Sequence, residues 1–274
     1  MELGSVAMKR QEFDFDLNET FPPLKSAPIV EAVIHWLAKP SKTLEALELK
    51  NQLAERLPDY PQILAEHDVR IAFQTTPNLG STEPPKKTER HATWRGFRLT
   101  STDNAQIVKF NSEGVSVSRL APYDKWETFV NEGLRMWDMF LELAEPLEVQ
   151  RLGVRFINRI NLPDAGSFQD FLANPPKCLE PLGLPLYTFL YQSTHDVPGY
   201  PYRIRAAQTV QPPSPPQRER HGLVVDIDVF TTTALPAREA NLTDHLARMR
   251  WLKNKTFFSL VSKRAIKSFQ KAEQ

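Results

Sequence analysis

Cysteine and long apolar stretches are the two clearest absences from this sequence of 274 residues. Cys178 is the only cysteine, which excludes a disulfide within the chain and is typical of a reducing compartment. No stretch approaches the roughly 18 to 20 uncharged apolar residues that span a bilayer. Residues 1–26 have no apolar core of a signal peptide and carry acids at Glu12, Asp14, Asp16 and Glu19. The sequence therefore predicts a cytoplasmic protein without a membrane segment.

An excess of charge of one sign is also missing. Lys and Arg number 34 against 33 Asp and Glu, a formal net charge of +1, so bulk electrostatics favour neither nucleic acid nor a membrane surface. Only ten glycines are present, and they form no phosphate-binding loop. The six histidines lack the spacing of metal ligands. We therefore expect no metal site, no cofactor and no catalytic residues.

What is present is an ordinary globular composition, 41% hydrophobic and 24% charged. We divide the chain into a flexible leader (1–26), an N-terminal half (27–149) and a C-terminal half (150–274) of one pseudo-duplicated unit. Met8 is an alternative to Met1 as the natural start, and the sequence does not decide between them.

The N-terminal half begins with an alternating segment, 27–37, that predicts a strand. A helix capped by Thr43 follows and stops before Pro58. Strands are expected at 69–75, 93–100, 105–110 and 115–120. A long amphipathic helix then starts at Asp124, with Glu127 completing a capping box.

The C-terminal half repeats this plan. We expect a strand at 150–161, a short helix after Ser167, and strands at 186–192, 202–210 and 223–230. A second long helix opens at Asn241 and breaks near Ser262. The loops 76–91 and 210–221, rich in proline and charge, are expected to be exposed and mobile.

The pattern predicts an α+β fold of two similar βαβ(3-4)α halves. Each long helix has a wide apolar stripe that needs a sheet face to cover. We therefore expect one extended, mostly antiparallel sheet with both long helices on the same face and the other face partly open. Six residues should be buried beneath the helices: Trp126, Phe129, Trp137, Leu246, Met249 and Leu252.

Three segments resemble a known protein family. They are Ala27-Pro28-Ile29-Val30-Glu31-Ala32, the central strand from Arg151 to Ile160, and Asp226 to Phe230 ahead of the last helix. In this order they resemble a sporadically distributed prokaryotic family of uncharacterised proteins of about this length. The resemblance covers nearly everything after the leader and implies no activity. Sporadic distribution implies an association with mobile or defence genes.

The most informative strand is 150–161, which places Arg151, Arg155 and Arg159 on one face. Three arginines cannot lie under a packed helix unless they are paired. One interpretation is a surface for nucleic acid or another anion. The other is a set of cross-strand ion pairs with Glu31, Asp226 and Asp228, which the neutral net charge favours.

Asp226 and Asp228 share one face of the otherwise apolar strand 223–230. Carboxylates at i and i+2 can hold Mg²⁺ for phosphoryl transfer, but here no Gly-Ser turn precedes them. Aligning the first strands of the two halves sets Glu31 against Arg155, and predicts an ion pair between Glu31 and Arg155 or Arg159.

The function that we expect first is therefore a non-catalytic interaction or accessory protein of a prokaryotic system, with a protein partner or self-association. Its candidate binding residues are Arg151, Arg155, Arg159, Glu31, Asp226 and Asp228. Two alternatives remain open: a nucleic-acid-binding protein that uses the arginine face, and a metal-dependent phosphoryl-transfer enzyme that uses the two aspartates.

Overall fold

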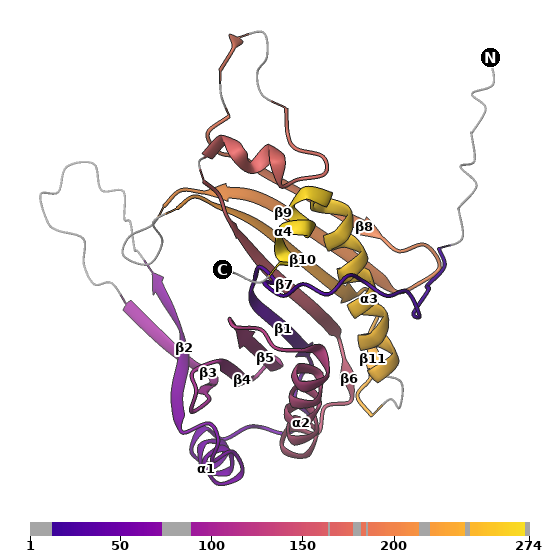
Figure 1. The fold of residues 1–274 in the computed structure, drawn as a ribbon. Helices are drawn as coiled ribbons and strands as arrows, with labels where there is room; N and C mark the ends of the chain where they lie inside the picture. The colour runs from indigo at the N-terminus through magenta and orange to yellow at the C-terminus, as the bar shows by residue number, and fades with distance from the viewer. Residues whose placement is uncertain are drawn as a thin grey trace, which may run out of the picture.

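One large antiparallel sheet organises the molecule (Figure 1). The computed structural model describes residues 13–72, 89–163, 165–177, 182–184, 186–213, 220–238 and 242–271. Among them, nine strands pair in the order β2-β3-β4-β5-β1-β7-β10-β9-β8. Their bounds are β1 (Ile29–Leu37), β2 (Gln62–Ala72), β3 (Glu89–Thr100), β4 (Gln106–Asn111), β5 (Gly114–Leu120), β7 (Arg151–Asn161), β8 (Leu190–Asp196), β9 (Tyr202–Gln211) and β10 (Gly222–Thr231). A two-residue pair, β6 (Glu148–Val149) and β11 (Leu235–Pro236), lies apart from it.

Two long helices, α2 (Trp126–Ala144) and α3 (Leu242–Leu260), cover the same face of the sheet (Figure 1). Helix α2 lies over β5 and β1, and α3 lies over β10, β7 and β9. The shorter elements are α1 (Ala46–Arg56), the 3₁₀ turn η1 (Ala165–Asp170) and α4 (Lys263–Phe269). The predicted α+β fold with one antiparallel sheet and both long helices on one face is confirmed.

Tight aromatic packing fixes α2 on the sheet. The ring of Trp36 on β1 stacks on the ring of Trp137 on α2, with centroids 5.7 Å apart. Gly133 allows this approach, because a Cβ there would lie 3.0 Å from the Trp36 ring. Burial of such large rings supplies much of the free energy that holds a helix to a sheet.

The helix-facing side of the sheet forms one continuous core across both halves. Phe156 on β7 contacts Trp126 and Phe129 of α2, and Lys253 of α3 lies over its other side. All six residues predicted to be buried beneath the helices are buried: Trp126, Phe129, Trp137, Leu246, Met249 and Leu252.

The first strands of the two halves are neighbours at the centre of the sheet, as predicted. Strand β1 pairs antiparallel with β7, and Ile34 lies opposite Val154. Next to this central pair on each side lies the strand that its half contributes last to the large sheet, β5 on one side and β10 on the other. The strand order is thus alike on the two sides, and the duplication of one unit stays a prediction.

Several local expectations were wrong. The N-caps of α1 and α2 are Glu45 and Lys125, and neither makes a side-chain capping hydrogen bond, so the caps expected from Thr43 and Asp124 are not used. Leu47 of α1 is 73% exposed although it is a large apolar residue. The break near Ser262 is confirmed, because its hydroxyl accepts a hydrogen bond from the Ala265 amide and caps α4.

Parts of other expectations lie outside the described residues. These are the leader up to residue 12, most of loop 76–91, residues 214–219 of loop 210–221, and Cys178. None of the helices in the described ranges combines the length and the apolar character of a membrane span.

Candidate functional site: the open face of the sheet

The face of the sheet opposite the helices carries the charged side chains (the open face). Along β1, residues that face the helices are buried, whereas Glu31, Val33 and His35 between them are only partly buried. Strand β7 alternates in the same way, with Arg151 and Arg155 on the open face. The predicted division of arginines and apolar residues between two faces is therefore correct.

Arg155 and Asp226 form a bidentate ion pair on this face. Arg155 Nε donates to Asp226 Oδ1 at 2.8 Å, and its Nη2 donates to Oδ2 at 2.5 Å. The backbone of Arg155 is opposite Asp228, so the pair with Asp226 runs diagonally between β7 and β10. This fork geometry gives the pair a defined orientation.

Asp228 is the most buried charged group of the open face, with a side chain only 5% exposed. Its Oδ2 accepts hydrogen bonds from Nη2 of Arg151 at 2.8 Å and from Nη2 of Arg205 on β9 at 2.7 Å. The guanidinium of Arg151 also lies 4.2 Å from the centroid of the Phe230 ring. One carboxylate thus accepts hydrogen bonds from two arginines that lie on the two strands beside it.

His35 completes the group through its contact with Arg151. Its Nε2 meets Nη1 of Arg151, and its ring lies over Gly153, where a Cβ would come within 2.2 Å of the ring. Burial and the adjacent Arg151 lower the pKa of His35 to about 4, so the imidazole is neutral at pH 7. We refer to Arg151, Arg155, Arg205, Asp226, Asp228 and His35 as the Arg–Asp cluster.

Arg159 lies apart from this cluster at the end of β7. Its guanidinium covers Gly222, donates to the side-chain oxygen of Asn161, and donates from Nη2 to the carbonyl oxygen of Arg220 at 2.9 Å. The third arginine of β7 therefore holds the start of β10 in place.

The expected ion pair of Glu31 is not found among the ion pairs of the described residues. Among the described residues Arg155 takes Asp226 as its partner. The pKa of Arg155 is raised mainly by its hydrogen bond to Asp226, and only in small part by the charge of Glu31. The predicted cross-strand ion pairs of Arg155 and Arg151 on β7 are formed with Asp226 and Asp228. The predicted pair with Glu31 is not among them. The alignment of the two strands predicted their adjacency but not which carboxylate each arginine reaches.

The pairing limits the chemistry of the Arg–Asp cluster. A phosphate would have to displace a carboxylate from Arg155 or Arg151, and Mg²⁺ would have to displace an arginine from Asp226 or Asp228. Within the described residues, His, Cys, Asp and Glu side chains form no group suited to a metal ion. The cluster is instead a fixed pattern of positive and negative charge on the open face.

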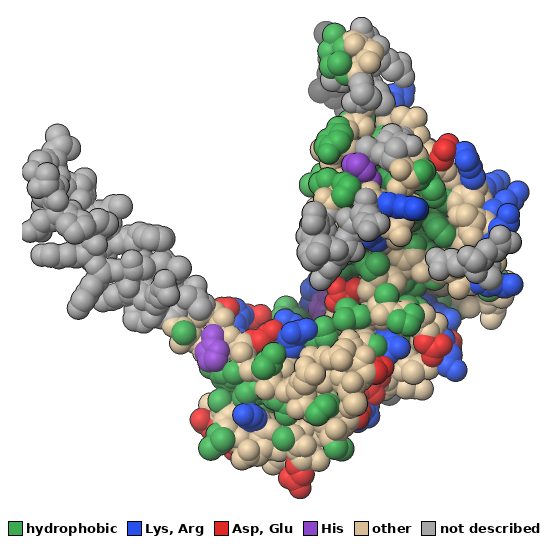
Figure 2. All heavy atoms as spheres, turned by 60° about the vertical axis from the view of Figure 1, so that its left-hand side comes forward, with side chains coloured by type: hydrophobic (Ala, Val, Ile, Leu, Met, Phe, Trp, Pro, Cys, Tyr) green, Lys and Arg blue, Asp and Glu red, His purple; other side chains and the backbone are tan. Residues whose placement is uncertain are grey.

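Two members of the cluster, His35 and Arg205, were not among the sequence-predicted site residues. Alternation places both on the open face, but only the register of β1, β7, β10 and β9 brings them beside Arg151 and Asp228. Figure 2 shows the molecule hollowed between its two halves, with acidic, basic and histidine side chains at the bottom of the hollow.

No family model, curated protein or solved structure matches this chain. Its function must therefore be argued from its own surfaces.

Proposed function

We propose that the chain is a non-catalytic interaction protein, an accessory component of a prokaryotic system, that binds a protein partner through the open face of its sheet. The observation that carries this proposal is the Arg–Asp cluster, in which three arginines and two aspartates are paired on a sheet face that none of the described helices covers. Fixed, complementary charges of this kind give specificity to protein–protein contacts.

The same pairing argues against the two alternatives. Nucleic-acid affinity depends on cations that are available to phosphates, and Arg151, Arg155 and Arg205 are each engaged by a carboxylate. A two-metal site needs carboxylates that are available to the metal, and Asp226 and Asp228 are both held by arginines.

A charge swap tests the proposal without removing the ion pair. In the double variant Arg155→Asp with Asp226→Arg, a pair of opposite charges is kept, but the pattern presented to a partner is reversed. The matched control is the swap Arg56→Glu with Glu142→Arg, which reverses an exposed pair between α1 and α2. Circular dichroism and thermal unfolding of all three proteins verify that they are folded.

Quantitative pull-down from the native host is the measurement. We expect the wild type and the helix-side control to retain the same partner, and the open-face swap to lose it. Equal recovery by all three proteins, or recovery of no partner by the wild type, would contradict the proposal. Sedimentation of the purified protein shows whether the partner is a second copy, and salt-sensitive retention on immobilised DNA would favour the nucleic-acid alternative.

A further inference from the structure

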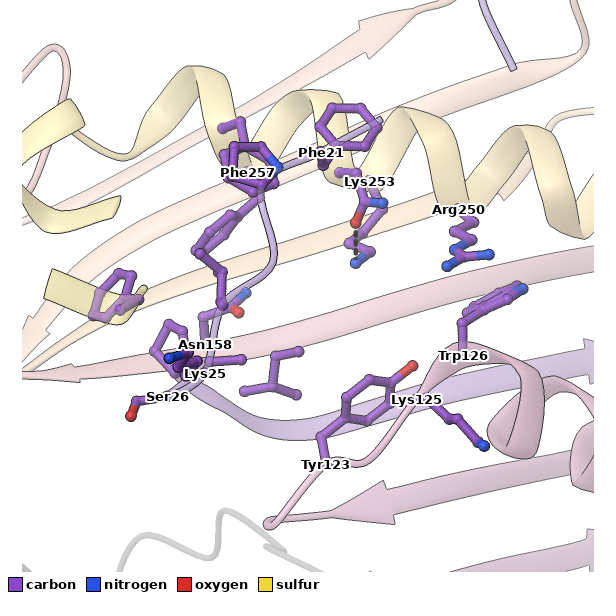
Figure 3. Close-up of a pocket in the computed structure, with 18 of the residues that line it drawn as sticks. Phe21, Lys25, Ser26, Tyr123, Lys125, Trp126, Asn158, Arg250, Lys253 and Phe257 are labelled. Carbon is purple, nitrogen blue, oxygen red and sulfur yellow. Dashed lines mark hydrogen bonds between the residues drawn. The ribbon is translucent and has the colours of Figure 1, made fainter. Parts of the chain in front are cut away.

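A large pocket lies on the other side of the sheet, between the first turn of α2, helix α3 and the ends of the central strands (Figure 3). Its volume is about 1420 Å³. Small-molecule sites commonly measure about 300 to 1,000 Å³, so this pocket has room for more than a single phosphate ion. The segment that precedes β1 forms one wall, where Phe21 stacks on Phe258 of α3.

Lys253 brings a positive charge into this pocket without a carboxylate to neutralise it. Its Nζ donates to Oδ1 of Asn254 and lies 3.9 Å from the centroid of the Phe156 ring. No ion pair to Lys253 is found among the described residues, and no carboxylate contributes to its pKa. Lys253 is only partly exposed, and an incompletely hydrated cation without an anion is costly, which points to a negatively charged ligand at this position.

Arg250 lies one helical turn before Lys253 and faces the same pocket (Figure 3). Its Nη1 donates to Glu127 on α2 at 3.0 Å, and its guanidinium lies 5.6 Å from the centroid of the Trp126 ring. The charge of Arg250 and the burial of Lys253 together lower the pKa of Lys253 to about 7. Glu127 takes only Nη1 of Arg250 among the described contacts, which leaves its other guanidinium N–H groups for a ligand. A ligand with two negative charges between these cations would relieve their mutual repulsion.

The remaining charged side chains of the lining keep the pocket cationic. Glu127 is engaged by Arg250 and Glu19 by Lys255, which leaves Asp124 as the third acidic residue of the lining. Positive charge comes also from Lys25, Lys125, Arg159 and Lys271. The lining thus carries six basic against three acidic side chains among the described residues, whereas the chain as a whole is nearly neutral.

The walls beside these cations are aromatic. Tyr123 precedes α2, and Trp126 is the first residue of that helix. Figure 3 shows Trp126 next to Arg250 and Tyr123 below Lys253. Tyr123 is partly exposed, and its ring is held edge-on by Phe129 and Phe156. Aromatic rings stack on nucleobases.

We propose that this pocket binds a nucleotide, with its phosphate between Lys253 and Arg250 and its base against the aromatic wall formed by Tyr123. An inorganic anion would satisfy the cations but leave most of the volume and the aromatic wall unused. A purely apolar ligand would leave Lys253 without a counter-charge. The proposal concerns the helix side of the sheet and is independent of the partner surface on the open face.

Calorimetric titration of the full chain with AMP and UMP tests this assignment, with ribose 5-phosphate and adenosine as the separate parts of the ligand. We expect at least one nucleotide to bind about tenfold or more tightly than ribose 5-phosphate and adenosine. Lys253→Met should weaken nucleotide binding about tenfold or more, whereas Lys253→Arg should retain most of it. Tyr123→Leu should weaken nucleotide binding but leave ribose 5-phosphate unaffected.

Lys263→Met is the matched control, because Lys263 is exposed on the following helix, α4, and does not line the pocket. It should bind nucleotide as the wild type does. The proposal would be overturned if neither nucleotide binds at millimolar concentration, or if Lys253→Met binds nucleotide as tightly as the wild type does. Binding of ribose 5-phosphate as tight as that of the nucleotides would overturn the assignment of the base. The open-face swap should keep its nucleotide affinity, so failure of the partner surface and failure of this site are distinguishable.

Discussion

Arg155 and Asp226 are joined by two hydrogen bonds between neighbouring strands, although their backbones are not directly opposite each other. The nearest backbone partner of Arg155 on that strand is Asp228, which instead receives the guanidinium groups of Arg151 and Arg205. The diagonal arrangement allows two aspartates to serve three arginines.

The first prediction compares the stability lost when Asp226 is changed with that lost when Glu31 is changed. Asp226→Asn removes one partner of a half-buried bidentate pair and should lower the free energy of unfolding by about 1 to 2 kcal/mol. Glu31→Ala removes no ion pair and should cost less than about 0.5 kcal/mol. Urea unfolding of the two variants measures both values. An equal or larger loss in Glu31→Ala would show that Glu31 does hold an arginine in solution.

The second prediction concerns the buried carboxylate of Asp228. Asp228→Asn leaves Arg151 and Arg205 without a counter-charge, and we expect a loss of about 2 to 4 kcal/mol. The control is Asp196→Asn, which breaks the exposed pair with Arg203 and should cost less than about 0.5 kcal/mol. Similar losses in the two variants would mean that the cluster contributes nothing beyond an ordinary surface pair.

The third prediction is a pH dependence that comes from His35. Its pKa is about 4 in the folded protein and near 6.5 in the unfolded chain, so acidification between these values protonates only the unfolded chain. The wild type should therefore lose stability as the pH falls from 6.5 to 4. The groups that face His35 are Arg151, Arg155, Arg205 and Asp228.

A glutamine at this position is the comparison, because His35→Gln keeps a hydrogen-bonding side chain without the titration. Between pH 7 and pH 4.5 we expect the wild type to lose at least about 1 kcal/mol more than the variant. Chemical unfolding at the two pH values measures the difference. Parallel losses would show that the imidazole has the same pKa in the folded and the unfolded protein.

The fourth prediction follows from Lys253 in the unliganded pocket. Its pKa falls from 10.5 in the unfolded chain to about 7, so the folded protein bears the cost of a desolvated ammonium below pH 7. Lys253→Met should raise the free energy of unfolding by about 1 kcal/mol or more at pH 6, with the gain shrinking as the pH rises from 7 toward 10.5. Unfolding curves at pH 6 and pH 9.5 measure the trend. A pH-independent difference would assign the effect to packing.

Much of the fold could be predicted because alternation and helical periodicity are local properties. The pattern of 150–161 alone placed Arg151 and Arg155 on the face away from Phe156. The partner of each arginine could not be predicted, since it depends on the register between β7 and β10 and on diagonal reach across the pleat. A change of register by two residues would give the same sequence pattern and different pairs.

The pocket could not be predicted for a different reason. Tyr123, Lys253 and Phe21 come from three segments that are far apart in the chain, and each has an ordinary local explanation. Lys253 in particular resembles a solvated position of an amphipathic helix until Phe156 and Arg250 are placed around it. Sites assembled by tertiary contact leave no motif in the sequence.

The position of β1 between β5 and β7 has a consequence for how the chain is synthesised. A ribosome releases β1 early, and β5 can pair with one of its edges while the N-terminal half is still being made. Its other edge has no partner until residues 151–161 have emerged, so a nascent chain exposes an unpaired strand from what becomes the middle of the sheet. A chaperone should therefore bind most strongly to nascent chains that end just before Arg151, and synthesis of β7 should release the chaperone.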